Sequence, residues 1–72
     1  MAAQPDEPIA LLVRTLSEYR RLGRDLTQTA AALGVHRSTV RYRLYRIGEL
    51  TGLPPDDPRS TDALRDIAGP HS

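Results

Sequence analysis

The stretch LTQTAAALGVHRSTVRYRLYR, Leu26 to Arg46, decides the fold of this 72-residue chain. Its first half predicts a short helix that Thr27 caps and that runs to Leu33. Gly34 ends this helix, because only a residue that tolerates a positive φ fits comfortably there. The second half predicts a longer helix that begins near His36. Two helices joined by so tight a turn are typical of a helix-turn-helix.

The spacing of small and apolar residues supports the same motif. Counted from Leu26, a small residue, Ala30, stands at the fifth position, Gly34 at the ninth and Val40 at the fifteenth. Ala30 lets the two helices cross closely, Gly34 makes the turn, and Val40 docks the second helix on the core. Each residue type is common alone, so the indication comes from the three together.

The second helix, predicted over about 37–48, has one apolar face and one basic face. At about 100° per residue, Val40, Leu44 and Ile47 fall within one narrow arc, which predicts the buried side. The opposite arc is basic, aromatic and free of acids. It holds Ser38, Tyr42 and Tyr45, flanked by Arg41 and Arg46, with Arg37 and Arg43 at the margins of the buried stripe.

The flanking segments predict two further helices. Ile9, Leu12 and Leu16 recur at helical spacing in a first helix, for which Gly23 is a suitable C-terminal cap. Asp57 and Pro58 are interpreted as the N-cap and first residue of a last helix that includes Leu64 and Ile67. No strand is predicted. We therefore expect an all-α, four-helix domain over 9–68, with a disordered segment 1–8 and a tail 69–72.

Charge is distributed unevenly along the chain. Residues 1–25 carry four arginines and four acids, 26–48 four arginines and no acid, and 49–72 two arginines and five acids, so the thirds sum to 0, +4 and −3. A local basic patch on a nearly neutral protein is the footprint of a domain that meets a polyanion. All ten cationic side chains are arginine. That choice suits phosphate or guanine, and it also arises from genomic base composition.

Several function classes are not supported. The chain has no cysteine, and its two histidines, His36 and His71, are far apart, so neither a metal site nor a cofactor site is predicted. No nucleophile, base and acid stand at a catalytic spacing, so no enzymatic activity and no small-molecule ligand are expected. No apolar run approaches the roughly 18 residues of a membrane span. These features predict a cytoplasmic protein associated with the nucleoid.

The segment LGVHRSTVRYRLYRIGELTGL resembles the C-terminal helix-turn-helix domain of the PucR and CdaR group of bacterial transcriptional regulators, which is similar to the DNA-binding part of Fis. The resemblance covers roughly Ile9 to Ala68 and departs from the family pattern at Ser38 and Gly48. It implies a Fis-like or homeodomain-like three-helix core with a C-terminal fourth helix. It also implies DNA contact at His36, Arg37, Ser38, Thr39, Arg41, Tyr42 and Arg43.

Physical reasoning assigns roles to these residues and adds others. Arg41 is placed to contact guanine through both arms of its guanidinium, whereas Arg37 and Arg43 are better aimed at phosphates. His36 is either a helix N-cap or a phosphate donor, and Ser38 and Thr39 are either caps or DNA contacts. The remaining candidates are Thr27 and Gln28, at the start of the first helix of the motif, and Arg46.

The predicted partner is double-stranded DNA, bound with a sequence preference. A domain of this size makes few contacts, so we expect a homodimer to read two half-sites about 34 Å apart. The alternative is a helical interaction module whose tyrosines and arginines bind an acidic protein partner, and Tyr45 would suit packing on a second subunit. Whether the chain is a complete small protein or an excised domain stays open.

Overall fold

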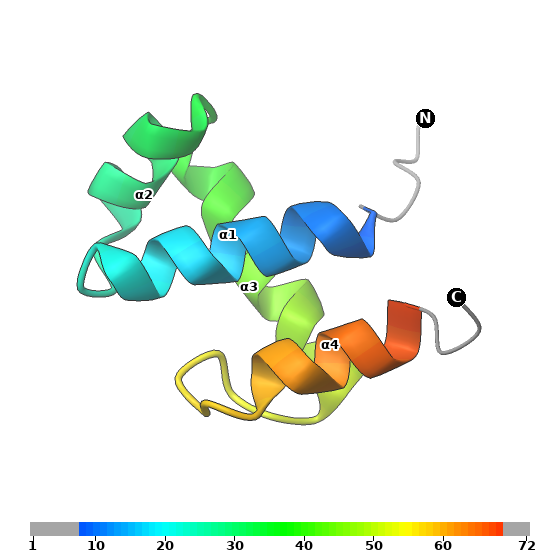
Figure 1. Ribbon diagram of the computed structural model, residues 1–72. Helices are drawn as coiled ribbons and strands as arrows, with labels where there is room; N and C mark the ends of the chain where they lie inside the picture. Colours follow the sequence, from blue (N-terminus) through cyan, green and yellow to red (C-terminus); the bar gives the residue numbers. More distant parts are fainter. Residues whose placement is uncertain (1–7, 69–72) are drawn as a thin grey trace.

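The computed structural model describes residues 8–68, so the predictions for residues 1–7 and for the tail 69–72 lie outside the described residues. Four helices and no strand are formed within that range: α1 (Ile9–Arg21), α2 (Leu26–Leu33), α3 (Arg37–Thr51) and α4 (Ser60–Ala68). The prediction of an all-α, four-helix fold is confirmed. In Figure 1, α3 crosses behind α1, α2 lies near the start of α3 and α4 near its end.

One apolar core joins α1, α3 and α4. Leu12 and Leu16 of α1 pack with Ile47 of α3 and Leu64 of α4, all with at most 1% of their surface exposed. The helices α1 and α4 lie side by side and run in opposite directions (Figure 1). Because α1 and α3 each contact all of the other helices, the two together hold α2 and α4 in place.

The tight turn between α2 and α3 forms as predicted. Gly34 adopts φ 69° and ψ 33°, the left-handed conformation that costs a residue with a Cβ about 1 kcal/mol or more. The amide of Val35 then donates to the carbonyl of Ala30 at 3.0 Å. Ala30 is 5% exposed and Val40 is fully buried, in agreement with the docking roles predicted for them.

Two predicted helix starts were wrong. The cap of α2 is Asp25, whose carboxylate Oδ1 accepts the amide of Gln28 at 2.9 Å, so Thr27 lies inside the first turn and not at the cap. The helix α4 begins at Ser60 and not at Pro58. Asp57 closes a separate turn there, because its carboxylate accepts the amide of Arg59 at 2.8 Å and its carbonyl accepts the amide of Ser60 at 3.0 Å.

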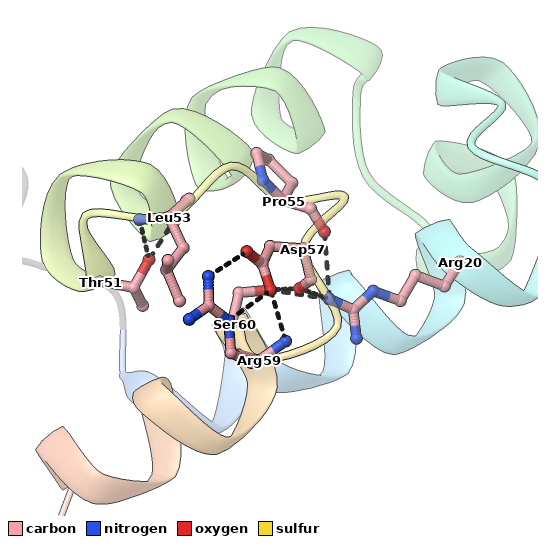
Figure 2. Close-up of polar contacts among 7 residues, drawn as sticks. All are labelled: Arg20, Thr51, Leu53, Pro55, Asp57, Arg59 and Ser60. Atoms are coloured by element: carbon pink, nitrogen blue, oxygen red, sulfur yellow. Dashed lines mark hydrogen bonds and ion pairs between the residues drawn. The ribbon is translucent and has the colours of Figure 1, made fainter.

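Arg20 fastens the segment between α3 and α4 to α1. Its guanidinium donates to the carbonyls of Pro55 and Asp57 and to Ser60 Oγ at 2.8 Å (Figure 2). It also donates to Thr61 Oγ1 at 2.9 Å. These acceptors lie in the turn and in the first two residues of α4, so one side chain of α1 holds the loop and the start of the last helix together.

The carboxylate of Asp57 is held by its own neighbour in this turn. The guanidinium of Arg59 lies 2.8 Å from it, and hydrogen bonds from that side chain and from the Arg59 amide lower the pKa of Asp57 to about 2. Asp57 is therefore ionised at neutral pH, and the guanidinium of Arg59 compensates its charge.

Candidate nucleic-acid interface

The helix α3 has the two faces that the sequence predicts. Val40 and Ile47, on its inner face, are fully buried. On the opposite side Ser38 is exposed, and Tyr42 and Tyr45 have 44% and 63% of their surface exposed. Side chains on this outward line are therefore available to a partner.

The start of α3 is organised by His36. Its Nδ1 accepts the amide of Ser38 at 3.2 Å, with Ser38 Oγ 3.0 Å away. Because a backbone amide only donates, Nδ1 must be unprotonated, and the neutral ring carries its proton on Nε2. His36 is exposed. The two roles predicted as alternatives are therefore compatible, since Nδ1 caps the helix while the Nε2 proton is offered outward.

Arg37 and Arg41 are the exposed cations of the first half of α3. Within residues 8–68, no carboxylate lies at ion-pair distance from either guanidinium. Thr39 lies between them in the sequence and is half-buried. Two exposed arginines without a carboxylate partner give the start of α3 a positive potential that attracts anions.

Arg43 does not lie where the sequence reasoning placed it. It was expected at the margin of the buried stripe, aimed at a phosphate, but only 9% of its surface is exposed. Its Nη1 donates to Thr15 Oγ1 of α1 at 3.2 Å, and the Thr15 hydroxyl donates in turn to the carbonyl of Leu11 at 2.7 Å. Arg43 therefore fastens α3 to α1 and does not extend into solvent.

Arg46 is tied to an acid on its own helix. Its Nη1 lies 2.7 Å from Glu49 Oε1, and 19% of the Arg46 side chain is exposed. Hydrogen bonding from Arg46, and then from Tyr45, lowers the pKa of Glu49, while the interaction with Glu49 raises the pKa of Tyr45. The second half of α3 thus carries a small cluster that is neutral as a whole.

The start of α2 is less favourable for a phosphate than expected. Thr27 and Gln28 are both exposed, as a DNA contact requires. The backbone amide of Gln28 is already bound by the carboxylate of Asp25, which places negative charge at this helix end. Any contact with DNA at this point would have to come from the two side chains and not from that amide.

Three further findings concern the described residues. No helix among the described residues is long and apolar enough to cross a membrane. In the same part of the chain, no group of three histidine or acidic side chains could hold a metal ion. A shallow apolar hollow lies beside the second half of α3, and it is lined by Leu44, Tyr45, Gly48, Glu49 and Pro55.

Comparison with known families identifies this arrangement. Residues 12–65 match the PucR C-terminal helix-turn-helix domain. The chain belongs to this family. No solved structure matches the PucR-type domain described here.

Curated relatives of this PucR-type domain are bacterial proteins. It is 48% identical over 50 residues to the transcriptional activator PmfR of Paenarthrobacter nicotinovorans, covering 69% of this chain and 11% of PmfR. It is 44% identical over 54 residues to the purine catabolism regulatory protein of Bacillus subtilis, covering 75% and 10%. The carbohydrate diacid regulator of Escherichia coli is 51% identical over 43 residues, covering 60% and 11%.

The chain spans about a tenth of the length of these relatives. As a PucR-type helix-turn-helix domain it is of the DNA-binding, transcription-regulating kind. The names of these three relatives describe regulators.

Sequence reasoning missed three residues around the PucR-type helix-turn-helix. Asp25 caps α2, Thr15 receives Arg43, and Glu49 lies on the outward side of α3. The position of Asp25 directly before Leu26 and the three-residue spacing of Arg46 and Glu49 are visible signals for two of them. Thr15 is 28 residues from Arg43, so only the packing of α1 on α3 reveals that contact.

Proposed function

We propose that the chain binds double-stranded DNA with a sequence preference, with the first half of α3 in the major groove. The observation that carries this proposal is the pair of exposed arginines, Arg37 and Arg41, in the first half of the second helix of a helix-turn-helix, without a carboxylate partner among the described residues. Relatives named as transcriptional regulators support it.

The residues have distinct roles in this proposal. Arg41 reads a base edge, guanine being the partner that a guanidinium binds through two donors, and Arg37 contacts phosphate. His36 offers its Nε2 proton to an acceptor on the DNA, and Tyr42 touches the backbone or a thymine methyl. Supporting contacts come from Ser38, Thr39, Thr27 and Gln28.

Two earlier candidates have reduced roles. Arg43 acts through its contact with α1 and keeps α3 in position, so it is a positioning residue for the interface. Arg46 contacts phosphate only when its ion pair with Glu49 opens.

A single domain makes few contacts with DNA, so useful specificity requires two copies. We infer that the functional form is a homodimer that reads half-sites about 34 Å apart, one turn of the duplex. A protein that binds chromosomal DNA in this way works in the cytoplasm, at the nucleoid, with neither an enzymatic activity nor a small-molecule ligand of its own in this domain.

The proposal is tested by fluorescence anisotropy with a random duplex and with a preferred duplex selected from a random library. We expect log affinity to fall linearly with log salt, with a slope of about 0.9 for each phosphate neutralised. Arg41→Ala should relax the preference at one base pair and cost about 1 to 3 kcal/mol there.

Arg14→Ala is the matched control, because Arg14 is an exposed arginine of α1 with no ion pair among the described residues. It should leave the base preference unchanged. Uniform weakening by Arg41→Ala on all sequences would make Arg41 a phosphate contact. No salt-dependent binding would contradict DNA binding by this chain and favour the alternative, an acidic protein partner.

A further inference from the structure

An acid lies on the outward side of α3. Glu49 follows Val40 by nine residues, which at about 100° per residue places it directly opposite the buried side of α3. It is therefore in line with Ser38, Tyr42 and Tyr45, and 42% of its side chain is exposed. The face that the sequence predicts to be acid-free over 37–48 ends in a carboxylate one residue later.

This carboxylate is close enough to affect DNA binding. Seven residues separate Glu49 from Tyr42, which corresponds to about 10 Å along the helix at 1.5 Å per residue. The Debye length at physiological salt is about 8 Å, so the charge of Glu49 is largely screened at Tyr42 but acts on groups that lie closer to its own turn of the helix. A phosphate near the second half of α3 would therefore be repelled by Glu49.

Glu49 also engages the nearest cation. Arg46 Nη1 is held 2.7 Å from its Oε1, and the lowered pKa of Glu49 shows that the ionised form is favoured. The result is a helix with two different halves. Arg37 and Arg41 in the first half have no carboxylate at ion-pair distance among residues 8–68, whereas in the second half the charge of Arg46 is compensated.

We propose that Glu49 limits the affinity of α3 for DNA, because it keeps Arg46 in an ion pair and presents a carboxylate where the interface ends. Phosphate attraction that is independent of sequence is weakened in this way, and binding depends more on the residues of the first half, which would read the bases. Glu49 is therefore a specificity-determining residue that does not contact a base. This inference rests on the proposed function.

The chain provides a matched control for this proposal. On α1, Glu18 forms an ion pair with Arg21 at the same three-residue separation, with an N to O distance of 2.6 Å. Glu49→Gln and Glu18→Gln change the net charge by the same +1 and each break one pair of the same kind. Only the first lies on the outward side of α3, so a difference between the two variants reports position and not total charge.

The experiment measures affinity for the preferred and the random duplex at about 50 mM and about 200 mM salt. Glu49→Gln should bind both duplexes more tightly, with a slope of log affinity against log salt steeper by about 0.9, the value for one more phosphate. Its advantage over the unmodified chain should then shrink about 3.5-fold between the two salt concentrations. The ratio of preferred to random affinity should fall. Glu18→Gln should show a smaller gain and no change in slope.

A second pair of variants tests the same ion pair by changing Arg46. Arg46→Gln leaves the carboxylate without this partner and should weaken binding to both duplexes. The double variant, Arg46→Gln with Glu49→Gln, restores the summed charge of the pair and should return the affinity towards that of the unmodified chain. Thermal melts of each variant check that the fold is kept.

The outcomes separate this inference from the proposed function. If the unmodified chain binds DNA with a salt slope but Glu49→Gln matches Glu18→Gln in affinity and slope, the role of Glu49 is wrong and DNA binding stands. Weaker binding by Glu49→Gln would also overturn it. If the unmodified chain shows no salt-dependent binding, both proposals are wrong.

Discussion

At the scale of single residues, arginine serves four different purposes in this domain. Arg41 is exposed and has no ion pair among the described residues, Arg46 is paired on its own helix, Arg43 is buried against Thr15, and Arg20 ties a loop to α1. The helical angle of each residue was predictable. The outcome was not, because a long side chain at the edge of a buried stripe extends either outward or inward, and a hydroxyl on another helix decides which.

His36 provides the clearest prediction at this scale. His36→Ala removes the acceptor for the Ser38 amide and should lower the free energy of unfolding by about 1 kcal/mol, the usual value of an N-cap. His36→Asn retains a short side-chain acceptor and should keep the stability, while the imidazole Nε2–H is replaced by a shorter amide donor that does not reach as far outward. Thermal unfolding and DNA affinity, measured on both variants, separate the two roles.

The two variants also define what would contradict this account. If His36→Ala and His36→Asn are equally stable, His36 is not a significant cap. If both bind DNA as tightly as the unmodified chain, the Nε2 proton contributes nothing to the interface. The tautomer itself is readable from the ¹⁵N shifts of the imidazole, where a proton on Nδ1 would exclude the cap.

At the scale of elements, the helix-turn-helix was predictable and the joints around it were less so. Gly34 and the Ala30 to Val40 spacing predict the turn correctly because a positive φ and a close helix crossing each require a particular residue type. The starts of α2 and α4 were each misplaced by two positions. Several oxygen-bearing side chains compete at each joint, and the sequence does not reveal which one accepts the amide.

Arg20 should contribute more than any other residue to holding the loop between α3 and α4 in place. Arg20→Met removes its hydrogen bonds to the loop and to the start of α4, which should cost about 2 kcal/mol and lower the midpoint of thermal unfolding by roughly 8 to 16 °C. Arg20→Lys should also be destabilised, since an ammonium cannot match the fork of donors that reaches these acceptors.

Arg14→Met is the control for this prediction, since Arg14 is exposed on the same helix and has no ion pair among the described residues. Its midpoint should stay within the change expected of an ordinary surface substitution, about 0.5 kcal/mol. A midpoint for Arg20→Met equal to that of Arg14→Met would mean that the loop is held by its own turn, through Asp57 and Ser60, and not by α1.

At the scale of the whole molecule, folding determines which arginines of the basic segment stay exposed. The excess of +4 over residues 26–48 was predictable from the sequence, but its location was not. Folding buries Arg43 and brings Glu49 beside Arg46, so of the four arginines in this segment Arg37 and Arg41 are the exposed ones without a carboxylate partner among the described residues. The candidate interface is therefore smaller and more sharply placed than the arginine count indicates.

The most direct test of this account is a ¹H–¹⁵N NMR titration of the 72-residue chain with duplex DNA. We predict that the largest shift changes fall on the amides of residues 36–42 and on the side-chain NH groups of Arg37 and Arg41, with smaller changes at Thr27 and Gln28. Changes concentrated on α4, or around Tyr45 and Pro55, would contradict the central claim that the first half of α3 is the surface that meets DNA.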